Sequence, residues 1–221
     1  MFRKFRTGLK QRRAFTAFSN ARYEEALHLF TELYHQYPNT EGARYNIGLC
    51  HVALQEYKEA EPYLLEEVKL YGEHFPRFKT LGDLYFLWGK RRKAEKYYTR
   101  ALDIEPKGLG HTLIRKRIEQ CQDVDLFART QESLQEYHRG IELMKGKDTD
   151  GAAQAFTKAI ELDEFNIHAL NNRGAILLNV EKDYKQATQL FKRALRLQEV
   201  PAFRANLEKA IDLERKEKKD D

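Results

Sequence analysis

The stretch RKAEKYYTRALDIEP, residues 92–106, decides the fold because much of it recurs elsewhere in the chain. Its relatives share an alanine, an apolar aromatic residue four positions later, and a small or apolar residue three positions after that. They are RYEEALHLFTELYHQYP (residues 22–38), GAAQAFTKAIELDEF (residues 151–165) and YKQATQLFKRALRLQEVP (residues 184–201). A phrase that recurs in this way indicates a repeat architecture, in which each copy is one structural unit.

The first block of repeats keeps a constant spacing, as packed structural units require. Ala26, Ala60 and Ala94 follow one another at intervals of 34 residues, and Gly48 and Gly82 are separated by the same interval. The spacing between chance similarities would vary along the chain. Units whose contact residues must meet the next unit keep a constant spacing. Three units in strict register are therefore predicted here.

A second block restarts further along the chain. Gly140 precedes Ala152 by 12 residues, and Gly174 precedes Ala187 by 13 residues. The last unit therefore carries one extra residue, which we place in its turn, NVEKDY. Two more units are predicted.

Each unit reads as a helical hairpin. Two apolar-periodic stretches of helical length are separated by a short polar turn and closed by a helix-stop residue, namely Pro38, Gly72 or Pro106. The glycine of the first helix and the alanine of the second are small, which lets the two helices approach closely. We expect the aromatic residue after the alanine to fill the gap against the adjoining hairpin, so that each unit buries surface it cannot cover alone.

At these positions the sequence resembles the tetratricopeptide repeat family, over residues 7–108 and 132–200. Two units depart from the family pattern and are expected to be irregular: Arg13 and Ala14 replace Leu-Gly in the first, while Pro62 and Glu67 interrupt the second helix of the second. The third unit matches almost completely, with Leu81, Gly82, Tyr85, Ala94, Tyr98, Ala101 and Pro106.

The resemblance implies an all-α fold, a right-handed superhelical stack of helical hairpins. Residues between and after the blocks supply a connecting helix, which we expect to cover the open end of the third unit, and a C-terminal capping helix. Whether the two blocks stack continuously stays open. The predicted boundaries are a basic N-terminal arm at 1–6, three repeats at 7–108, the connecting helix at 109–131, two repeats at 132–200, and the capping helix with a charged tail at 201–221.

The net charge of +5 is concentrated at the start of the chain. Residues 1–23 hold seven basic residues and no acidic one, which leaves 39 − 7 = 32 basic against 34 acidic residues elsewhere. Such an arm could lie on an anionic membrane surface or along nucleic-acid phosphates, or serve as a presequence. We favour the plainer interpretation, in which it is a solubilising extension of the first repeat helix.

Signals for catalysis, cofactors and metals are weak. HExxH, GxxxxGK[ST] and GxGxxG motifs are absent, and His28, His35 and the Cys50–His51 neighbours offer too few ligands for a zinc site. We expect no enzymatic activity, no cofactor and no metal. The chain has two isolated cysteines, and no apolar run approaches the roughly 18 residues of a membrane span. Basic residues stand where a secretory signal would be apolar. We therefore expect the chain to be cytoplasmic.

The resemblance implies a protein-binding scaffold whose first helices line a concave groove for an extended or helical segment of another protein. The family's carboxylate-clamp mode is not expected, because Gln11 and Phe15 stand where that mode has Lys and Asn. The groove residues implied are Phe15, Phe18, Tyr45, Asn46, Leu49, Lys79, Asp83, Phe86, Tyr137, His138, Ile141, Met144, Asn171, Asn172 and Leu178.

The alternative is an adaptor that contacts nucleic acid or a membrane surface through the basic arm. Salt separates the two hypotheses, because binding to phosphates weakens steeply as salt rises while apolar and amide contacts change little. The packing of apolar groove residues against the next hairpin remains open as a third interpretation of those positions.

Overall fold

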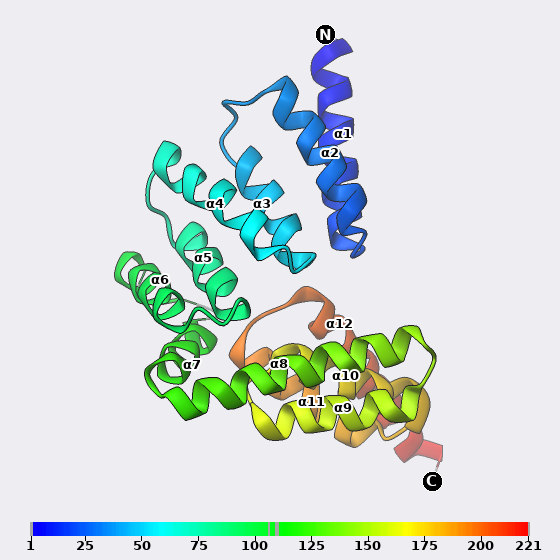
Figure 1. Cartoon of the computed structure of the whole chain (residues 1–221). Coiled ribbons are helices and arrows are strands. Elements are labelled where there is room, and N and C mark those ends of the chain that lie inside the picture. Colours follow the sequence, from blue (N-terminus) through cyan, green and yellow to red (C-terminus); the bar gives the residue numbers. More distant parts are fainter. Residues whose placement is uncertain (1, 106, 109–110, 221) are drawn as a thin grey trace. The chain divides into compact units, whose positions relative to one another are not determined.

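A computed structural model describes residues 2–105, 107–108 and 111–220, and the side chains of residues 8–105, 107–108 and 111–217. Every regular element in these ranges is a helix, so the predicted all-α fold of stacked helical hairpins is confirmed. The chain forms two compact units, residues 1–105 and residues 106–221 (Figure 1). Each unit is described by itself below. The expected helix stop at Pro106 and the expected helical residue Leu109 lie outside the described residues.

The first unit consists of three helical hairpins that follow one another along the chain (Figure 1). Within each hairpin the two helices pack closely, and each hairpin also packs against the next. The helices are α1 (Phe2–Ser19), α2 (Tyr23–Gln36), α3 (Ala43–Ala53), α4 (Tyr57–Tyr71), α5 (Phe75–Leu87) and α6 (Arg91–Ile104).

The second unit contains two hairpins with a short helix before them and a long helix after them. The final helix packs against α11, and its Phe203 and Ala210 are buried in the core. The elements are α7 (His111–Gln122), α8 (Val124–Lys145), α9 (Thr149–Leu162), α10 (Ile167–Ile176), the π-helical turn η1 (Leu177–Glu181), α11 (Tyr184–Leu197) and α12 (Pro201–Asp220).

The glycines of the first helices mark the close crossings within the hairpins. A Cβ atom added to Gly82 would lie 2.4 Å from the ring of Tyr98, and one added to Gly140 would lie 2.5 Å from the ring of Phe156. The aromatic residue that follows the alanine therefore covers the glycine of its own hairpin. The missing glycine side chain opens a space for the ring inside the hairpin. The predicted packing towards the adjoining element is also seen, because Phe30 shares a core cluster with Ile47 of α3 and Phe191 shares one with Ala210 of α12.

The hairpins turn in one recurring way. After each first helix one residue adopts a left-handed backbone, and in the first four hairpins an N–H group then bonds to a carbonyl five residues back, as in Lys90 N to Tyr85 O at 2.8 Å. This arrangement satisfies carbonyl groups that the end of a helix leaves open. The left-handed residues are Ala21, Gln55, Gly89, Lys147 and Lys182, with φ of 57°, 63°, 74°, 63° and 59°.

The fifth hairpin accommodates the extra residue that the spacing predicted. Here the closing bond runs from Asp183 N to Leu177 O at 3.0 Å and spans six residues, because the last turn of the first helix widens into η1. A π-helical turn is the usual way in which a helix absorbs one inserted residue. The insertion therefore leaves Gly174 and Phe191 in contact, as in the other hairpins.

Replacing Lys147 by glycine is expected to stabilise the protein by about 0.5–1 kcal/mol, because a side chain in the left-handed region is strained and glycine is not. The midpoint of urea unfolding measures this. Lys158, exposed in the interior of α9, is the matched control: there the same change removes a helix-forming side chain and is expected to cost about 1 kcal/mol. If both glycine substitutions shifted the urea midpoint in the same direction, the left-handed conformation of Lys147 would be contradicted.

The structure accommodates the irregular positions of the first two repeats within regular helices. Helix α4 continues through Pro62, which is exposed. Glu67 is fully buried, and its Oε1 accepts a hydrogen bond from Gly42 N at 2.5 Å, so that it caps the beginning of α3. At the chain start, α1 already begins at Phe2, so residues 2–6 extend the first repeat helix instead of forming a separate arm.

The connecting segment differs from its prediction. One helix over 109–131 was expected, but α7 ends at Gln122 and α8 begins at Val124, because the Asp123 carboxylate accepts a hydrogen bond from Leu126 N at 2.9 Å and starts a new helix. Helix α8 then runs through the predicted boundary at residue 132. The structure also assigns α7 to the second unit, where Leu113 packs in the core with Leu170 and Phe203.

Candidate functional site

A cavity of about 370 Å³ lies in the first unit at the junction of α1, α2 and α3. Phe30 is buried, Leu33 and Tyr37 are half-buried, and these three side chains give the cavity an apolar wall. Polar groups from the other two helices and from the loop before α3 complete the lining. The full set is Gly8, Gln11, Phe30, Leu33, Tyr37, Thr40, Glu41, Gly42, Ala43 and Asn46.

Two side-chain amides face this cavity from the first helices, Gln11 on α1 and Asn46 on α3. Asn46 was predicted as a groove residue, and it is half-buried with no hydrogen-bond partner for its amide among the described residues. Gln11 was not predicted as a groove residue. It was mentioned only because it differs from the residue that the carboxylate-clamp mode has at that position. An amide offers both a donor and an acceptor, so the pair can bind a peptide backbone beside the apolar wall.

Three other predicted groove residues, Tyr45 of α3 and Lys79 and Asp83 of α5, are engaged within the protein. Tyr45 Oη lies 2.8 Å from Thr80 Oγ1, and burial raises the pKa of the Tyr45 hydroxyl, which stays neutral. Lys79 Nζ donates to Asp83 Oδ2 at 2.5 Å, and Tyr98 Oη donates to Asp83 Oδ1 at 2.8 Å. These groups hold the hairpins in place, and a ligand would have to compete for them.

The predicted apolar groove residues of the first unit separate into accessible and inaccessible ones. Phe15 is 45% exposed, with its ring centroid 5.1 Å from that of Phe30 in an edge-to-face contact. Phe18 and Leu49 are half-buried. Phe86 is only 2% exposed and packs near Tyr98, so it belongs to the core and offers no contact surface.

In the second unit, α8 contributes the predicted residues Tyr137, His138, Ile141 and Met144. Tyr137 and Ile141 are half-buried against the core that contains Phe156, and Met144 is 42% exposed. Burial lowers the pKa of His138, so its imidazole is neutral at neutral pH. This side of α8 therefore presents uncharged aromatic and apolar groups.

Asparagines of α10 and α12 form a chain of hydrogen bonds. Asn206 Nδ2 donates to Asn171 Oδ1 at 3.0 Å, and Asn171 Nδ2 donates to Asn172 Oδ1 at 3.2 Å. Asn171 and Asn172 were predicted site residues, and the structure brings them together with Asn206, which the sequence analysis missed. Leu178, predicted on the same side, is 2% exposed and lies in the core beside Phe191.

Two aromatic neighbours of this asparagine chain were also missed as site residues. The His168 ring lies 5.9 Å from the Tyr137 ring and 5.9 Å from the Phe203 ring, measured between centroids. A signal was available: Phe203 follows His168 by 35 residues and Asn206 follows Asn171 by 35, the interval that also separates Ala152 from Ala187. Helix α12 thus occupies the place of a further first helix.

The described parts of the chain hold neither a metal site nor a membrane span. No group of three or more His, Cys, Asp or Glu side chains there could hold a metal ion. In the same ranges, no helix is long and apolar enough to cross a membrane. Nothing in the structure supports the alternative of a separate basic arm that contacts phosphates, because residues 2–6 are part of α1.

Comparison with known families agrees with this architecture. Sequence models of the tetratricopeptide repeat match residues 80–107 and 137–202, and the model for anaphase-promoting complex, cyclosome, subunit 3 matches residues 13–67. Together with the hairpins and their glycine–aromatic crossings, these matches place the chain in a known class: it is a tetratricopeptide repeat protein. Such repeats generally mediate protein–protein interaction.

Two curated proteins match parts of the chain. It is 31% identical over 87 residues to the human Protein O-mannosyl-transferase TMTC2, across 38% of this chain, and 24% identical over 150 residues to a TPR repeat-containing protein of Methanocaldococcus jannaschii, across 67%. The chain spans 10% and 25% of the lengths of these relatives.

Solved tetratricopeptide structures are also similar. The TPR2AB domain of yeast Sti1, solved in a complex with pHSP90, aligns at 16% identity and a TM-score of 0.48, over 88% of this chain and 78% of that one. YrrB, described as a TPR protein with an unusual peptide-binding site, aligns at 18% identity and a TM-score of 0.45, over 90% of each chain.

Proposed function

We propose that this protein is a non-enzymatic scaffold that holds an extended or helical segment of another protein on its first helices. The observation that carries the proposal is the cavity between α1, α2 and α3, where an apolar wall adjoins the unbonded amide of Asn46. An apolar side chain of the partner would occupy the cavity. The amides of Gln11 and Asn46 would bind the partner's backbone on either side of it.

The second unit offers the same chemistry on a different set of residues. The asparagine chain of α10 and α12 lies beside Tyr137, His168 and Phe203, and none of these side chains brings a fixed charge. Amides next to aromatic rings suit an uncharged peptide segment, because burying a charged one here would leave it without a partner. Each unit would therefore bind a short stretch of polypeptide.

We also expect the protein to work in a reducing compartment such as the cytoplasm. Cys50 and Cys121 are both buried free thiols. Burial raises the pKa of the Cys50 thiol to about 12, which keeps it protonated and unreactive. Neither cysteine is placed to form a disulfide or to act as a nucleophile.

Replacing Asn46 and Asn172 together by alanine tests the proposal. Partners would first be captured from a lysate of the source organism and identified, and one purified partner would then be titrated against each variant. The double variant is expected to bind at least about tenfold more weakly, equivalent to roughly 1.4 kcal/mol of lost hydrogen bonding. Helicity and melting temperature should hardly change, because Asn46 and Asn172 are only half-buried.

Asn39 and Asn179, two exposed asparagines outside the proposed site, are the matched controls. Replacing both by alanine should leave the affinity for the partner unchanged. If the Asn46 and Asn172 double variant binds its partner as tightly as the control, the amides do not hold the partner's backbone, and this mechanism is wrong.

A further inference from the structure

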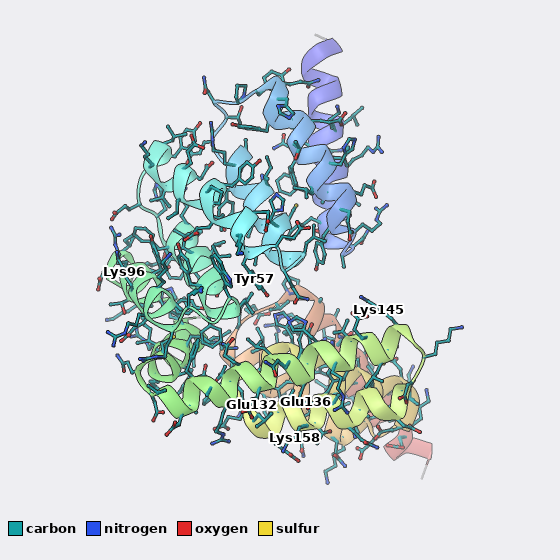
Figure 2. The ribbon with its side chains drawn as sticks, viewed as in Figure 1. Tyr57, Lys96, Glu132, Glu136, Lys145 and Lys158 are labelled. Atoms are coloured by element: carbon teal, nitrogen blue, oxygen red, sulfur yellow. The ribbon has the colours of Figure 1, made fainter. Side chains whose placement is uncertain are left out.

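A second feature of the first unit lies between the two helices of its third hairpin, away from the cavity. Four aromatic rings of α5 and α6 form a continuous row, and Tyr57 of α4 extends it. The neighbouring ring centroids are 6.5 Å apart for Tyr57 and Trp88, 6.3 Å for Trp88 and Tyr85, 5.4 Å for Tyr85 and Tyr97, and 5.7 Å for Tyr97 and Phe78. Figure 2 labels Tyr57, at one end of the row, and Lys96 on α6.

A cation lies over each of the last four rings. Three are lysines, and the fourth is Arg100, whose guanidinium carbon is 4.3 Å from the Phe78 centroid. These distances fall within the range of cation–π attraction. The lysine contacts are Lys90 over Trp88 at 5.2 Å, Lys93 over Tyr85 at 4.6 Å and Lys96 over Tyr97 at 5.8 Å.

The charge of this row is only partly neutralised. The stretch from Lys90 to Arg100 contains six basic residues and one acidic residue, Glu95. Lys93 pairs with Glu61 at 2.9 Å and Arg100 pairs with Glu73. The other exposed cations of this stretch, Lys90, Arg92 and Lys96, form no ion pair among the described residues, although Lys90 helps to lower the pKa of Glu61. A ring orients a cation without cancelling its charge, so a positive strip remains.

The arrangement is also unfavourable for α6 itself. Its first turn has no acidic residue, and Lys90 at the N-cap is followed by Arg91, Arg92 and Lys93. The beginning of a helix carries a partial positive charge, which acidic residues stabilise and basic residues oppose. Where a sequence breaks such a local rule, the reason is often a function of the site.

We propose that Lys90 and Lys96, which lie over rings of this aromatic row, form together with the exposed Arg92 a second binding surface for an acidic segment of a protein. The surface is distinct from the cavity and does not depend on the proposed groove. The three cations span six residues at the start of α6, about 9 Å at the helical rise of roughly 1.5 Å per residue. About three residues of an extended partner would span this distance, so a few Asp or Glu side chains could contact all three cations.

An acidic peptide fits this surface better than single-stranded nucleic acid does. Proteins bind single strands by stacking bases on the faces of aromatic rings. Here lysine and arginine already cover the ring faces, and Tyr85 and Phe78 are both 1% exposed. A partner therefore meets cations and not rings. Because the rings hold the lysine side chains in place, less side-chain freedom is lost on binding.

The test uses the full chain and a fluorescein-labelled oligoglutamate peptide of about eight residues, which is long enough to span the row at roughly 3.3 Å per residue. The wild type is expected to bind it, with an affinity that falls as salt rises. Lys90→Glu with Arg92→Glu and Lys96→Glu should weaken binding at least about tenfold. Stability should not fall, since acidic residues suit the start of α6, and circular dichroism checks this.

The matched control reverses the same number of charges elsewhere, with Lys145→Glu, Lys158→Glu and Lys192→Glu, all exposed in the second unit. It should keep the peptide affinity within about threefold of the wild type. The Asn46→Ala and Asn172→Ala variant should also bind the peptide normally, which separates this surface from the groove. An equal loss in the control, no binding by the wild type, or tighter binding of an oligothymidylate than of the peptide would each overturn the proposal.

Discussion

Replacing Tyr98 by alanine is expected to lower the free energy of unfolding by about 3–5 kcal/mol, which makes it one of the two most damaging single changes predicted here. The Tyr98 side chain is 1% exposed and lies on Gly82, where the opposing helix has no side chain that could move into the space left behind. Its hydroxyl also donates to Asp83 Oδ1 at 2.8 Å. The substitution therefore removes packing and a hydrogen bond together.

Urea unfolding followed by Trp88 fluorescence measures this effect, because Trp88 is the one tryptophan of the chain and lies in the same hairpin. Tyr98→Phe separates the two contributions: it keeps the ring and is expected to cost only about 0.5–1.5 kcal/mol for the lost hydrogen bond. If alanine cost no more than phenylalanine, the ring would not be the main contact at this crossing, and the glycine–aromatic account of the hairpins would fail.

Replacing Asp163 by alanine is expected to cost a similar amount, about 3–5 kcal/mol, for an electrostatic reason. Asp163 is 4% exposed in the loop between α9 and α10, and it accepts hydrogen bonds from Arg117 Nη1 at 3.0 Å and from Gln120 Nε2 at 2.7 Å. Removing the carboxylate takes away the buried counter-charge that Asp163 offers to the Arg117 guanidinium. The desolvation cost of the guanidinium, and not the lost contact alone, sets the size of the effect.

The neighbouring pair of Lys116 and Glu119 provides the control on the same helix. Their side chains meet at 2.7 Å but are exposed, so Glu119→Ala should change the stability by less than about 0.5 kcal/mol. Thermal and urea unfolding followed by circular dichroism compare the two variants. Equal effects of Asp163→Ala and Glu119→Ala would show that α7 is not anchored to the second unit through a buried charge.

The sequence could predict the hairpins because their determinants are local and periodic. An interval of 34 residues between small residues fixes where helices cross, and the extra residue before Ala187 was already visible as a spacing of 13. The interval does not reveal which neighbouring helix a given side chain will contact. That Tyr98 also covers the glycine of its own hairpin depended on three-dimensional geometry, as did the place of the extra residue in η1.

The segment between the blocks was harder to predict because its determinants are long-range. Leu113 and Arg117 look like ordinary members of an amphipathic helix, and their partners Leu170 and Asp163 lie about 50 residues further along the chain. The break between the two helices could be predicted from Asp123, since Asp is a preferred residue at the N-cap of a helix. The packing of α7 on the second unit through Leu113 and Arg117 could not be predicted in this way.

The candidate site could be predicted in part. The positions on the first helices follow from the family resemblance and the register of the repeats, and Asn46 does line the cavity. Register cannot tell an accessible position from a buried one, which is why Phe86 and Leu178 were included although they lie in the core. It also passed over His168 of α10, and it passed over Asn206 because residues 201–221 are predicted as a cap and not as a further first helix.

Photo-crosslinking to a purified partner tests the central proposal, that the first helices hold the partner segment, most directly. A benzoylphenylalanine residue would replace Phe15 or Met144, which are exposed on first helices, or Lys58 or Lys158, which are exposed on second helices. Crosslinks from positions 15 and 144 to defined peptides of the partner, with little from 58 and 158, are expected. Crosslinks confined to positions 58 and 158 would contradict the proposal and move recognition to the second helices.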